Sequence, residues 1–260
     1  MRRCFIFGLG YSAGRIAAAL EARGWEVIST GRAGTLSFDD AANVRLALTG
    51  ADAVLSSVPP SADGDPVLAT YGADIAAHKV VYLSSTGVYG DTGGAWVDET
   101  APTGTGRRTA RAEADASWLE RGARVLRLPG IYGPGRSALD RVREGKAHRI
   151  DLPAQVFSRV HVDDIVSGAV AAFDAPPGAY NLADDEPTSQ NAVIEEACRL
   201  LGLEPPPLQS LDAAGLSPMA RGFYAENRRV ANGKARRVLG WKPRFPNYRE
   251  GLRAILAGEG

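Results

Sequence analysis

Short apolar runs alternate with stretches of helical spacing over roughly the first half of the chain. The runs have strand length and occupy residues 4–8, 25–30, 51–58, 80–85 and 123–128. Between them, residues 12–24 and 108–122 have the composition and spacing of helices. Strands that alternate with helices need crossover connections, which produce a parallel sheet with helices on both faces. The pattern therefore predicts an α/β fold with a doubly wound parallel Rossmann sheet.

The pattern changes in the second half. Short strand-like runs at 155–162 and 179–183 mix with helical stretches at 163–173, 189–202 and 248–256. We therefore expect a Rossmann domain over residues 1–135 and a smaller C-terminal α/β substrate lobe over residues 136–260. The chain is expected to cross between these two parts more than once.

Composition narrows the function classes. The chain has 260 residues with a formal net charge of zero, which does not favour nucleic-acid binding. Its apolar runs are too short to span a bilayer, and Gly8 and Gly10 interrupt the first run, so we interpret it as a strand rather than a signal peptide. Cys4 and Cys198 are expected to be reduced thiols of a cytoplasmic protein. The three histidines show no metal-ligand spacing, so no metal site is predicted.

A glycine-rich loop, FGLGYSAG at 7–14, lies between the first strand and the first helix. Gly8 allows a tight turn, Gly10 allows a pyrophosphate to approach the backbone, and Ala13 allows helix and strand to pack closely. The amide groups at the helix start would face the anion. The loop therefore predicts dinucleotide binding, with Leu9, Tyr11 and Ser12 also near the cofactor.

The end of the second strand selects the form of the cofactor. NAD sites usually have an acidic residue there, whereas this chain has Ser29, Thr30 and Arg32. A guanidinium pairs well with a phosphate, so we predict NADP(H) over NAD(H); the alternative is that Arg32 is a solvated loop residue. Loops at the carboxyl ends of strands line the ligand crevice, which adds three further cofactor candidates. These are Ser57, Val58 and Pro59.

Four later motifs complete a resemblance: LSSTGVYG at 83–90, RLPGIYGPGR at 127–136, RVHVDDIV at 159–166 and YNLADDEP at 180–187. Together with the glycine loop, they make the chain similar to the short-chain dehydrogenase/reductase superfamily. It most resembles the atypical, YeeZ-like members of the extended epimerase/dehydratase branch. The resemblance implies that Ser85 is catalytic and orients the reacting oxygen. It also implies that Ser84 and Pro129 contact the cofactor and that Thr86 contacts the substrate.

The resembled enzymes use a Tyr-x-x-x-Lys pair as acid/base and cation. Alignment on Glu113 places Thr105 and Thr109 at these two positions, and threonine can do neither task. No tyrosine in the chain has a lysine four residues later. Arg107 or Arg108 could replace the cation, but arginine does not serve as a general acid or base.

The remaining candidates have weaker support. The resemblance suggests an aspartate in place of a family asparagine, and Asp65 is favoured over Asp74 as this second catalytic residue. Tyr89 and Tyr132 are interpreted mainly as packing residues, and His161 as structural rather than as a base. Two arginines of the second lobe are the candidates for a phosphate of the substrate, the alternative being surface arginines. They are Arg136 and Arg159.

Three functions remain open. The first, which we favour, is an NADP(H)-dependent oxidoreductase or epimerase that acts on a sugar-like or nucleotide-sugar-like substrate by a non-standard acid/base route. The second is a non-catalytic NADP(H)-binding sensor or regulatory protein. The third, a ligand-binding protein without a cofactor, is disfavoured by the glycine loop. The expected partners are a small-molecule substrate and, through the resemblance, a second copy in a homodimer, with no nucleic acid and no membrane.

Overall fold

A six-stranded parallel sheet forms the centre of the protein, which confirms the predicted fold class. The computed structural model describes residues 1–106 and 109–258, and the strand order is β10-β6-β4-β3-β1-β2. Every neighbouring pair in this sheet is parallel. The strands are β1 (Arg3–Phe7), β2 (Glu26–Ser29), β3 (Ala53–Ser56), β4 (Lys79–Ser85), β6 (Arg124–Leu128) and β10 (Gly178–Asn181).

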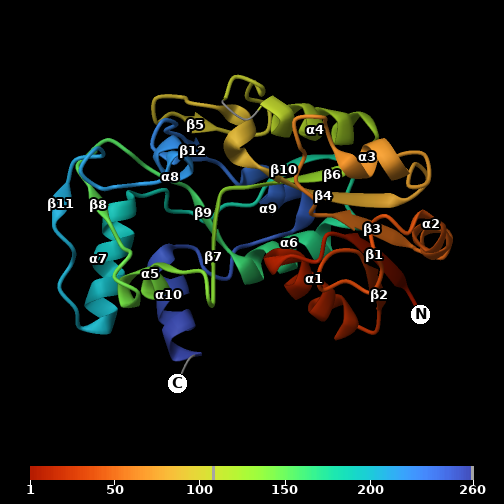
Figure 1. Ribbon diagram of the computed structural model, residues 1–260, viewed down its shortest axis with the longest axis horizontal. Helices are drawn as coiled ribbons and strands as arrows, with labels where there is room; N and C mark the ends of the chain where they lie inside the picture. Colours follow the sequence, from red (N-terminus) through yellow and green to blue (C-terminus); the bar gives the residue numbers. More distant parts are fainter. Residues whose placement is uncertain (107–108, 259–260) are drawn as a thin grey trace.

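Helices cover both faces of the sheet because side chains alternate along each strand. Cys4 and Ile6 pack toward α1 (Tyr11–Glu21) and α6 (Val162–Ala172), while Phe5 and Phe7 pack on the other face. That second face is covered by α2 (Ala41–Thr49), α3 (Pro66–Tyr71) and α4 (Thr109–Glu120). Figure 1 shows α1 and α6 below the sheet and α3 and α4 above it. The buried strands therefore read as nearly continuous apolar runs.

The order of the strands creates a crevice. The chain leaves β1 for β2 at one edge and then returns to the other side of β1 as β3. Helices on either side of this switch point diverge, so the carboxyl ends of the strands open into a ligand crevice. The glycine loop leads directly from β1 into α1, so it lies at this crevice.

A second, smaller core forms the lobe. Leu139, Ile194 and Leu252 are buried together where three helices meet. These are α5 (Ala138–Arg143), α7 (Gln190–Leu201) and α10 (Tyr248–Ala257). The lobe lies at the opposite end of the molecule from α2 (Figure 1). It also contains β8 (Arg149–Ile150), β11 (Leu208–Gln209) and α8 (Pro218–Phe223).

The chain passes between the sheet and the lobe several times. Both α6 and β10 belong to the sheet part although they follow residue 136, and α9 (Gly233–Leu239) packs against the same face through Ala235 and Leu239. Residue 136 thus marks the first entry into the lobe rather than the end of the sheet domain. The short elements at the junction are η1 (Thr86–Tyr89), β5 (Trp96–Val97), β7 (Gly130–Tyr132), β9 (Arg159–His161) and β12 (Arg229–Val230).

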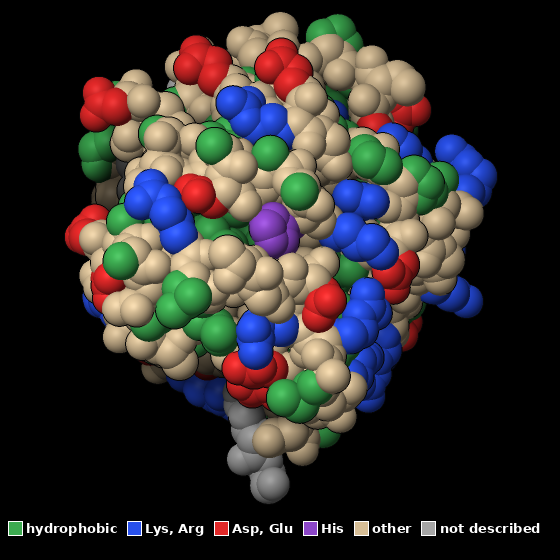
Figure 2. Space-filling view, turned by 90° about the vertical axis from the view of Figure 1, so that its right-hand side faces the viewer, with side chains coloured by type: hydrophobic (Ala, Val, Ile, Leu, Met, Phe, Trp, Pro, Cys, Tyr) green, Lys and Arg blue, Asp and Glu red, His purple; other side chains and the backbone are tan. Residues whose placement is uncertain are grey.

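The exposed surface carries charges of both signs. On the face in Figure 2, which is the sheet end of the molecule, basic and acidic side chains are interspersed and hydrophobic ones are scattered. Among the described residues, no helix has the length and apolar character needed to cross a membrane.

Candidate functional site

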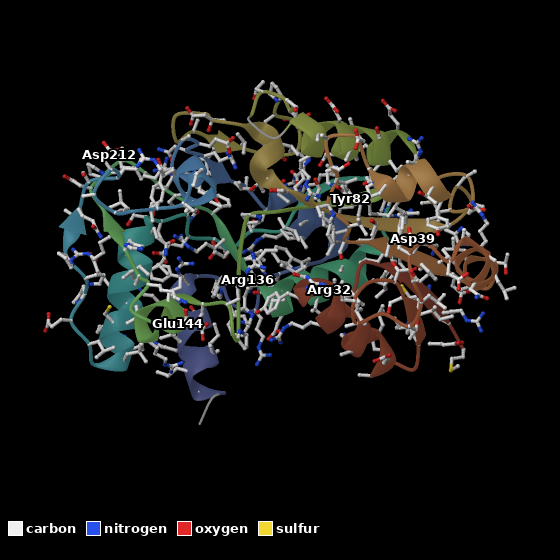
Figure 3. The ribbon with its side chains drawn as sticks, viewed as in Figure 1. Arg32, Asp39, Tyr82, Arg136, Glu144 and Asp212 are labelled. Carbon is white, nitrogen blue, oxygen red and sulfur yellow. The ribbon has the colours of Figure 1, made fainter. Side chains whose placement is uncertain are left out.

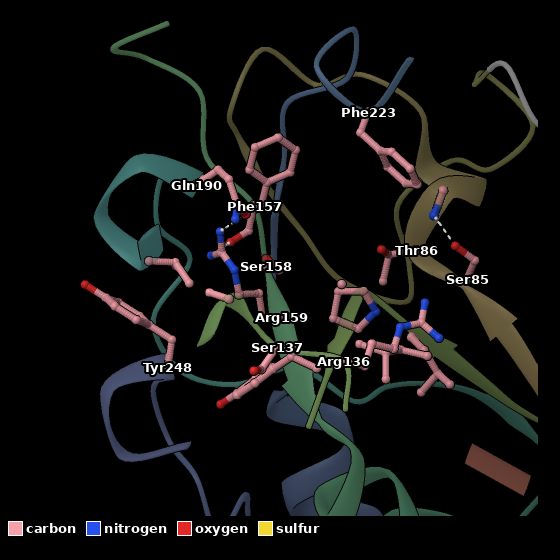
Figure 4. A pocket seen from close by; sticks show the side chains of 18 of the residues that line it. Ser85, Thr86, Arg136, Ser137, Phe157, Ser158, Arg159, Gln190, Phe223 and Tyr248 are labelled. Atoms are coloured by element: carbon pink, nitrogen blue, oxygen red, sulfur yellow. Dashed lines mark hydrogen bonds between the residues drawn. The ribbon is translucent and has the colours of Figure 1, made fainter. Parts of the chain in front are cut away.

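A cleft of about 1050 Å³ lies between the carboxyl edge of the sheet and the lobe. Its sheet side is formed by the start of α1, the end of β4 and the turn after β6, and its lobe side by β9, α8 and parts of α5, α7 and α10. Figure 4 shows the side chains that project into it. Of the residues predicted to bind a ligand, those that line the cleft are Gly10, Tyr11, Ser12, Ala13, Ser57, Ser84, Ser85, Thr86, Pro129, Arg136 and Arg159.

The glycine loop is held in place by the strands beside it. Gly8 has a φ of 82°, in the left-handed region that favours glycine. Its N–H donates to Thr30 Oγ1 at 3.3 Å, and the Ser57 hydroxyl donates to its carbonyl oxygen. Leu9 N donates to the Thr30 carbonyl oxygen at 2.9 Å. Thr30, predicted to contact the cofactor, therefore supports the loop from behind, and Ser57 both supports the loop and lines the cleft.

The start of α1 has room for an anion. A Cβ atom placed on Gly10 would have no neighbour within 4 Å, and the first turn of the helix contains no acidic residue. Ala13, at the third small position of the motif, is 1% exposed and packs into the core. The eleven-residue helix thus presents its positive end to an open space, which is the arrangement that binds phosphate groups.

Tyr11 connects this helix start to the lobe. Its hydroxyl donates to the Pro134 carbonyl oxygen at 3.0 Å, and the guanidinium of Arg136 lies 5.6 Å from the centre of its ring. Burial raises the pKa of Tyr11, against the opposing charges of Arg15 and Arg136. Arg136 is exposed, so a cation stands next to the anion-binding end of α1.

The residues predicted to select NADP(H) lie at the end of β2. Ser29 is 3% exposed and therefore points into the protein. Arg32 is exposed, and it forms no ion pair with another described residue. Figure 3 shows Arg32 on the sheet side and Arg136 on the lobe side of the same region. Val58 packs against the core and Pro59 is exposed, and neither is among the described residues that line the cleft. Arg32 is likewise not among the described residues that line the cleft, although its side chain is exposed to solvent.

The two serines at the end of β4 have different partners. The Ser84 hydroxyl donates to Asp115 Oδ2 at 2.6 Å, so its proton is already committed. Ser85 lines the cleft, and its Oγ accepts from Gly87 N at 3.1 Å (Figure 4), so among the described residues its hydroxyl proton is not committed to a protein acceptor. Thr86 also lines the cleft although it is only 4% exposed. The arrangement supports Ser85 as the hydroxyl that meets a ligand and makes Ser84 part of the scaffold.

A buried ion pair lies beneath these serines. Asp115 and Arg127 are 1% and 3% exposed, and Arg127 Nη2 lies 2.6 Å from Asp115 Oδ1. Arg127 also donates to the hydroxyl of Tyr89 at 3.0 Å, and that hydroxyl donates to Asn181 Oδ1 at 2.8 Å. Burial raises the pKa of Tyr89. Tyr89 thus belongs to a structural network, in agreement with its interpretation as a packing residue.

Helix α4 faces the cleft with residues other than those that the alignment used. Glu113 and Thr109 are exposed, whereas Asp115 is buried. Thr105 precedes the helix, and its hydroxyl donates to the Tyr89 carbonyl oxygen at 3.0 Å. Neither Thr105 nor Thr109 is among the described residues that line the cleft. Arg107 and Arg108 lie outside the described residues.

The cation of this helix that reaches the cleft is Arg111, which the sequence reasoning missed. Arg111 lines the cleft, and its Nη1 donates to the Tyr82 hydroxyl at 2.8 Å. It lies one helical turn before Asp115. The sequence contained a signal for Arg111, because Trp118 is the aromatic residue of the helix and must face the core. Positions three, four and seven residues before Trp118 share its face, and the last of these is Arg111.

The structure does not support the predicted catalytic role of Asp65. Asp65 caps α3: its Oδ1 accepts from Val67 N at 2.9 Å and from Leu68 N at 3.0 Å. Its Oδ2 accepts from the indole N–H of Trp118 at 2.8 Å. It is 8% exposed and is not among the described residues that line the cleft. Both carboxylate oxygens are thus engaged in holding α3 and α4, which corrects the prediction.

His161 acts as a helix cap rather than a base. Its Nδ1 accepts from Asp163 N at 3.2 Å, and its ring packs between Tyr132 and Phe245 with centroids at 5.2 and 4.2 Å. Burial lowers the pKa of His161 to about 4, so the imidazole is neutral near pH 7. Tyr132 is buried beside it, and burial raises the pKa of its hydroxyl. Neither group is tuned for proton transfer near neutral pH.

No family model matches the chain. Among curated proteins, the chain is similar to the 3-diazoavenalumate denitrifying reductase of a Streptomyces species, with 36% identity over 171 residues. That match covers 60% of this chain and 55% of the relative, so the chain spans about half the length of that protein. It is also similar to protein YeeZ of Escherichia coli strain K12, with 29% identity over 290 aligned residues covering 95% and 97% of the two chains.

Solved structures give the most complete matches. A conserved protein of unknown function from Silicibacter pomeroyi is 41% identical, with a TM-score of 0.87 and coverage of 100% of this chain and 99% of that one. The dTDP-glucose 4,6-dehydratase of Bacillus anthracis, solved with NAD, has 15% identity, a TM-score of 0.77 and coverage of 99% and 96%. A human epimerase family protein solved with NADPH has 17% identity, a TM-score of 0.78 and coverage of 98% and 99%.

The predicted resemblance is thereby confirmed in both sequence and fold. The chain belongs to the same family as the Silicibacter pomeroyi protein, and it shares the fold of the NAD(P)-dependent epimerases and dehydratases among its structural neighbours.

Proposed function

We propose that this protein is an NADP(H)-dependent oxidoreductase or epimerase that acts on a small molecule without a Tyr-x-x-x-Lys pair. One observation carries the proposal: a single cleft of about 1050 Å³ joins the open, positive end of α1 to the Ser85 hydroxyl. The first feature suits a dinucleotide and the second a reacting oxygen. Because they share one cleft, the two ligands would meet in it.

The residues present fit a nicotinamide dinucleotide. Gly10 leaves the space that a pyrophosphate needs, and Arg136 adds a cation beside it. Arg32, exposed on the loop after β2, would meet the 2′-phosphate of NADP(H). Further support comes from the structural neighbours solved with NAD and NADPH and from the relative named as a reductase.

The protein's own groups would orient and polarise the substrate. A bound nicotinamide supplies or accepts a hydride. The Ser85 hydroxyl would donate a hydrogen bond to the reacting oxygen, with Thr86 beside it, and Arg111, which also lines the cleft, would provide a positive charge. Such donors stabilise the negative charge that develops on the reacting oxygen in the transition state.

The proton of the reaction comes from water or from the substrate in this proposal. In the described part of the chain, four tyrosines line the cleft, and the pKa of each is raised, mainly by burial. None is shifted toward neutral pH, where a general acid works best. These tyrosines are Tyr11, Tyr132, Tyr224 and Tyr248.

The substrate class is a separate question. The family resemblance suggests a sugar-like or nucleotide-sugar-like molecule, whose phosphate would approach Arg136 and Arg159. Arg136 is exposed to the cleft, whereas both terminal nitrogens of Arg159 already donate to oxygen atoms of the protein. The phosphate role is therefore better supported for Arg136.

The test has a binding step and a turnover step. NADPH binding is measured by its fluorescence, and Arg32→Ala should weaken NADPH at least tenfold while leaving NADH unchanged. NADPH oxidation is then screened against a panel of carbonyl compounds. Ser85→Ala should lower kcat by ~10²-fold or more, within the range for loss of one donor that stabilises a developing oxyanion, while Ser84→Ala should mainly lower stability. Equal kcat values for the Ser85→Ala variant and the wild type would reject the catalytic role.

A non-catalytic NADP(H) sensor is the second candidate. The observation that favours it is the raised pKa of the four tyrosines that line the cleft in the described part of the chain, because none of these four can replace the missing pair as an acid or base near neutral pH. Such a sensor would change its oligomeric state when NADPH is exchanged for NADP⁺, with no turnover in the screen. Mass photometry with each cofactor form distinguishes the two functions, and it also tests the predicted homodimer.

A further inference from the structure

Helix α8 and the turns on either side of it form part of the lobe side of the cleft. We call residues 211–225 the α8 segment. The described residues through which it lines the cleft are Leu216, Ser217, Ala220, Phe223 and Tyr224. Phe223 is 47% exposed, and Figure 4 shows its ring above Ser85 and Thr86. A large apolar side chain of this segment therefore faces the open cleft over the residues that are proposed to meet the substrate.

The α8 segment is weakly attached to the rest of the protein. Among its described side chains, none belongs to the apolar clusters that form the cores of the sheet and the lobe. The guanidinium of Arg221 bonds within the segment, to the Leu211 carbonyl oxygen at 3.1 Å and to Asp212 Oδ1 at 2.6 Å. A contact that does leave the segment is the edge-to-face pair of Tyr224 and Phe157, with ring centroids 5.5 Å apart. A segment that buries so little apolar area moves at a low cost in free energy.

Both ends of the α8 segment are fixed. Before it, β11 pairs with β8, and the Gln209 carbonyl oxygen accepts from Asp151 N at 2.9 Å. After it, Asn227 N donates to Asp91 Oδ1 at 2.8 Å, and the Asn227 carbonyl oxygen accepts from Gly94 N at 2.9 Å. The side chain of Asn227 forms two further hydrogen bonds to the backbone that precedes β9. Movement of the segment is therefore confined to a flap between two anchored ends.

Helix α8 is built to move as one unit. Ser217 caps it, with Oγ accepting from Ala220 N at 3.3 Å, and Pro218 is its first residue. Shortly before the cap, Gly215 has a φ of 58°, and a Cβ atom placed on it would have no neighbour within 4 Å. Glycine rotates more freely than any other residue. The turn at Gly215 thus provides a hinge next to a preformed helical turn.

We propose that the α8 segment is a lid that closes when NADPH binds, so that Phe223 covers the nicotinamide beside Ser85. The inference rests on the proposed function, which places the nicotinamide in the part of the cleft that contains Ser85. Closure would remove the exposed ring of Phe223 from water, and this burial supplies a driving force. It would also shield the hydride transfer from bulk water.

Hydrogen–deuterium exchange followed by mass spectrometry tests the closure, with the protein measured alone and saturated with NADPH. Amide exchange in peptides that cover residues 211–225 should slow about fivefold or more when NADPH is bound. Peptides from α9 provide the internal reference, because no described residue of α9 lines the cleft, and their exchange should not change. Unchanged exchange at residues 211–225 in protein that has bound NADPH would overturn the proposal.

The position of Phe223 is tested by quenching the fluorescence of bound NADPH with acrylamide, a neutral quencher that reaches only exposed fluorophores. Phe223→Ala should raise the quenching constant about threefold, because the nicotinamide loses its cover. The matched control is Leu208→Ala, which removes a similarly exposed apolar side chain (50% against 47%) on β11, outside the described residues that line the cleft. This control should leave the quenching constant unchanged. Equal quenching of Phe223→Ala and the wild type would show that Phe223 does not cover the nicotinamide.

NADPH affinity is measured on the same samples, and it separates the two proposals. If the wild type does not bind NADPH, the proposed function and the lid are both rejected. If NADPH binds but exchange at residues 211–225 does not slow, the lid alone is rejected. Slower exchange together with the effect of Phe223→Ala on quenching would support both.

Discussion

The buried ion pair between Asp115 and Arg127 offers the sharpest test of how the site is supported. Asp115→Asn keeps the shape of the side chain but removes its charge. In the native protein, Asp115 accepts from Arg127 at 2.6 to 3.3 Å and from the Ser84 hydroxyl at 2.6 Å. Burial lowers the pKa of Arg127, but the hydrogen bond and charge of Asp115 more than offset this, so the net shift is upward. In the variant, Arg127 remains charged and buried without its counterion.

The expected loss follows from that geometry. Breaking a buried pair by neutralising one partner costs about 3–5 kcal/mol. Asparagine keeps one acceptor oxygen, so we expect about 3 kcal/mol, which corresponds to a decrease in Tm of roughly 6–12 °C for a protein of this size. The Asp115→Leu/Arg127→Met double variant should lose less than Asp115→Asn, because no charge is left unpaired.

Urea unfolding monitored by circular dichroism at pH 7 measures the free energy of unfolding of each variant. The matched control is Asp212→Asn, which breaks an ion pair with Arg221 that has the same 2.6 Å separation but whose side chains are 41% and 88% exposed. That change should cost no more than about 1 kcal/mol. If Asp115→Asn were as mild as Asp212→Asn, the pair would not be desolvated, and the account of Ser84 as scaffold would be wrong.

Three further changes have defined outcomes. Gly10→Ala should leave the free energy of unfolding within about 1 kcal/mol of wild type. It should weaken NADPH binding at least tenfold in a fluorescence titration, because the added Cβ enters only the open space at the end of α1. Unchanged affinity would place the pyrophosphate elsewhere. Asp65→Ala should lower the free energy of unfolding by about 2 kcal/mol through loss of the helix cap. The kcat of the folded fraction should be unchanged. A large fall in kcat would restore the predicted catalytic role of Asp65. Burial raises the pKa of Asp184 to about 8. Between about pH 4 and 8 the native state therefore keeps a proton on Asp184 that the unfolded chain has released. The free energy of unfolding of the wild type should fall over this range by up to ~1.4 kcal/mol per pH unit relative to Asp184→Asn. Parallel unfolding curves for these two proteins from pH 5 to 9 would show that Asp184 is ionised in the native state.

The sequence alone was sufficient for the sheet and for the position of the glycine loop within it. Strand and helix periodicities are local, and the glycine loop is a contiguous segment whose conformation depends on the absence of side chains. Gly8, Gly10 and Ala13 therefore have the expected places, at the turn, at the open end of α1 and in the core. The crossover rule then leads from alternating elements to a parallel sheet.

Only the tertiary structure decided which polar side chains face the cleft. Ser84 and Ser85 are neighbours at the end of β4, and they differ because the Ser84 hydroxyl donates to Asp115, far along the chain, whereas the Ser85 oxygen accepts from Gly87 N. Asp65 is a cap because Trp118 and the start of α3 occupy both of its oxygens. Hydrogen-bond partners this distant in sequence carry no local signal, so pattern reasoning could nominate these residues but could not distinguish a free side chain from an engaged one.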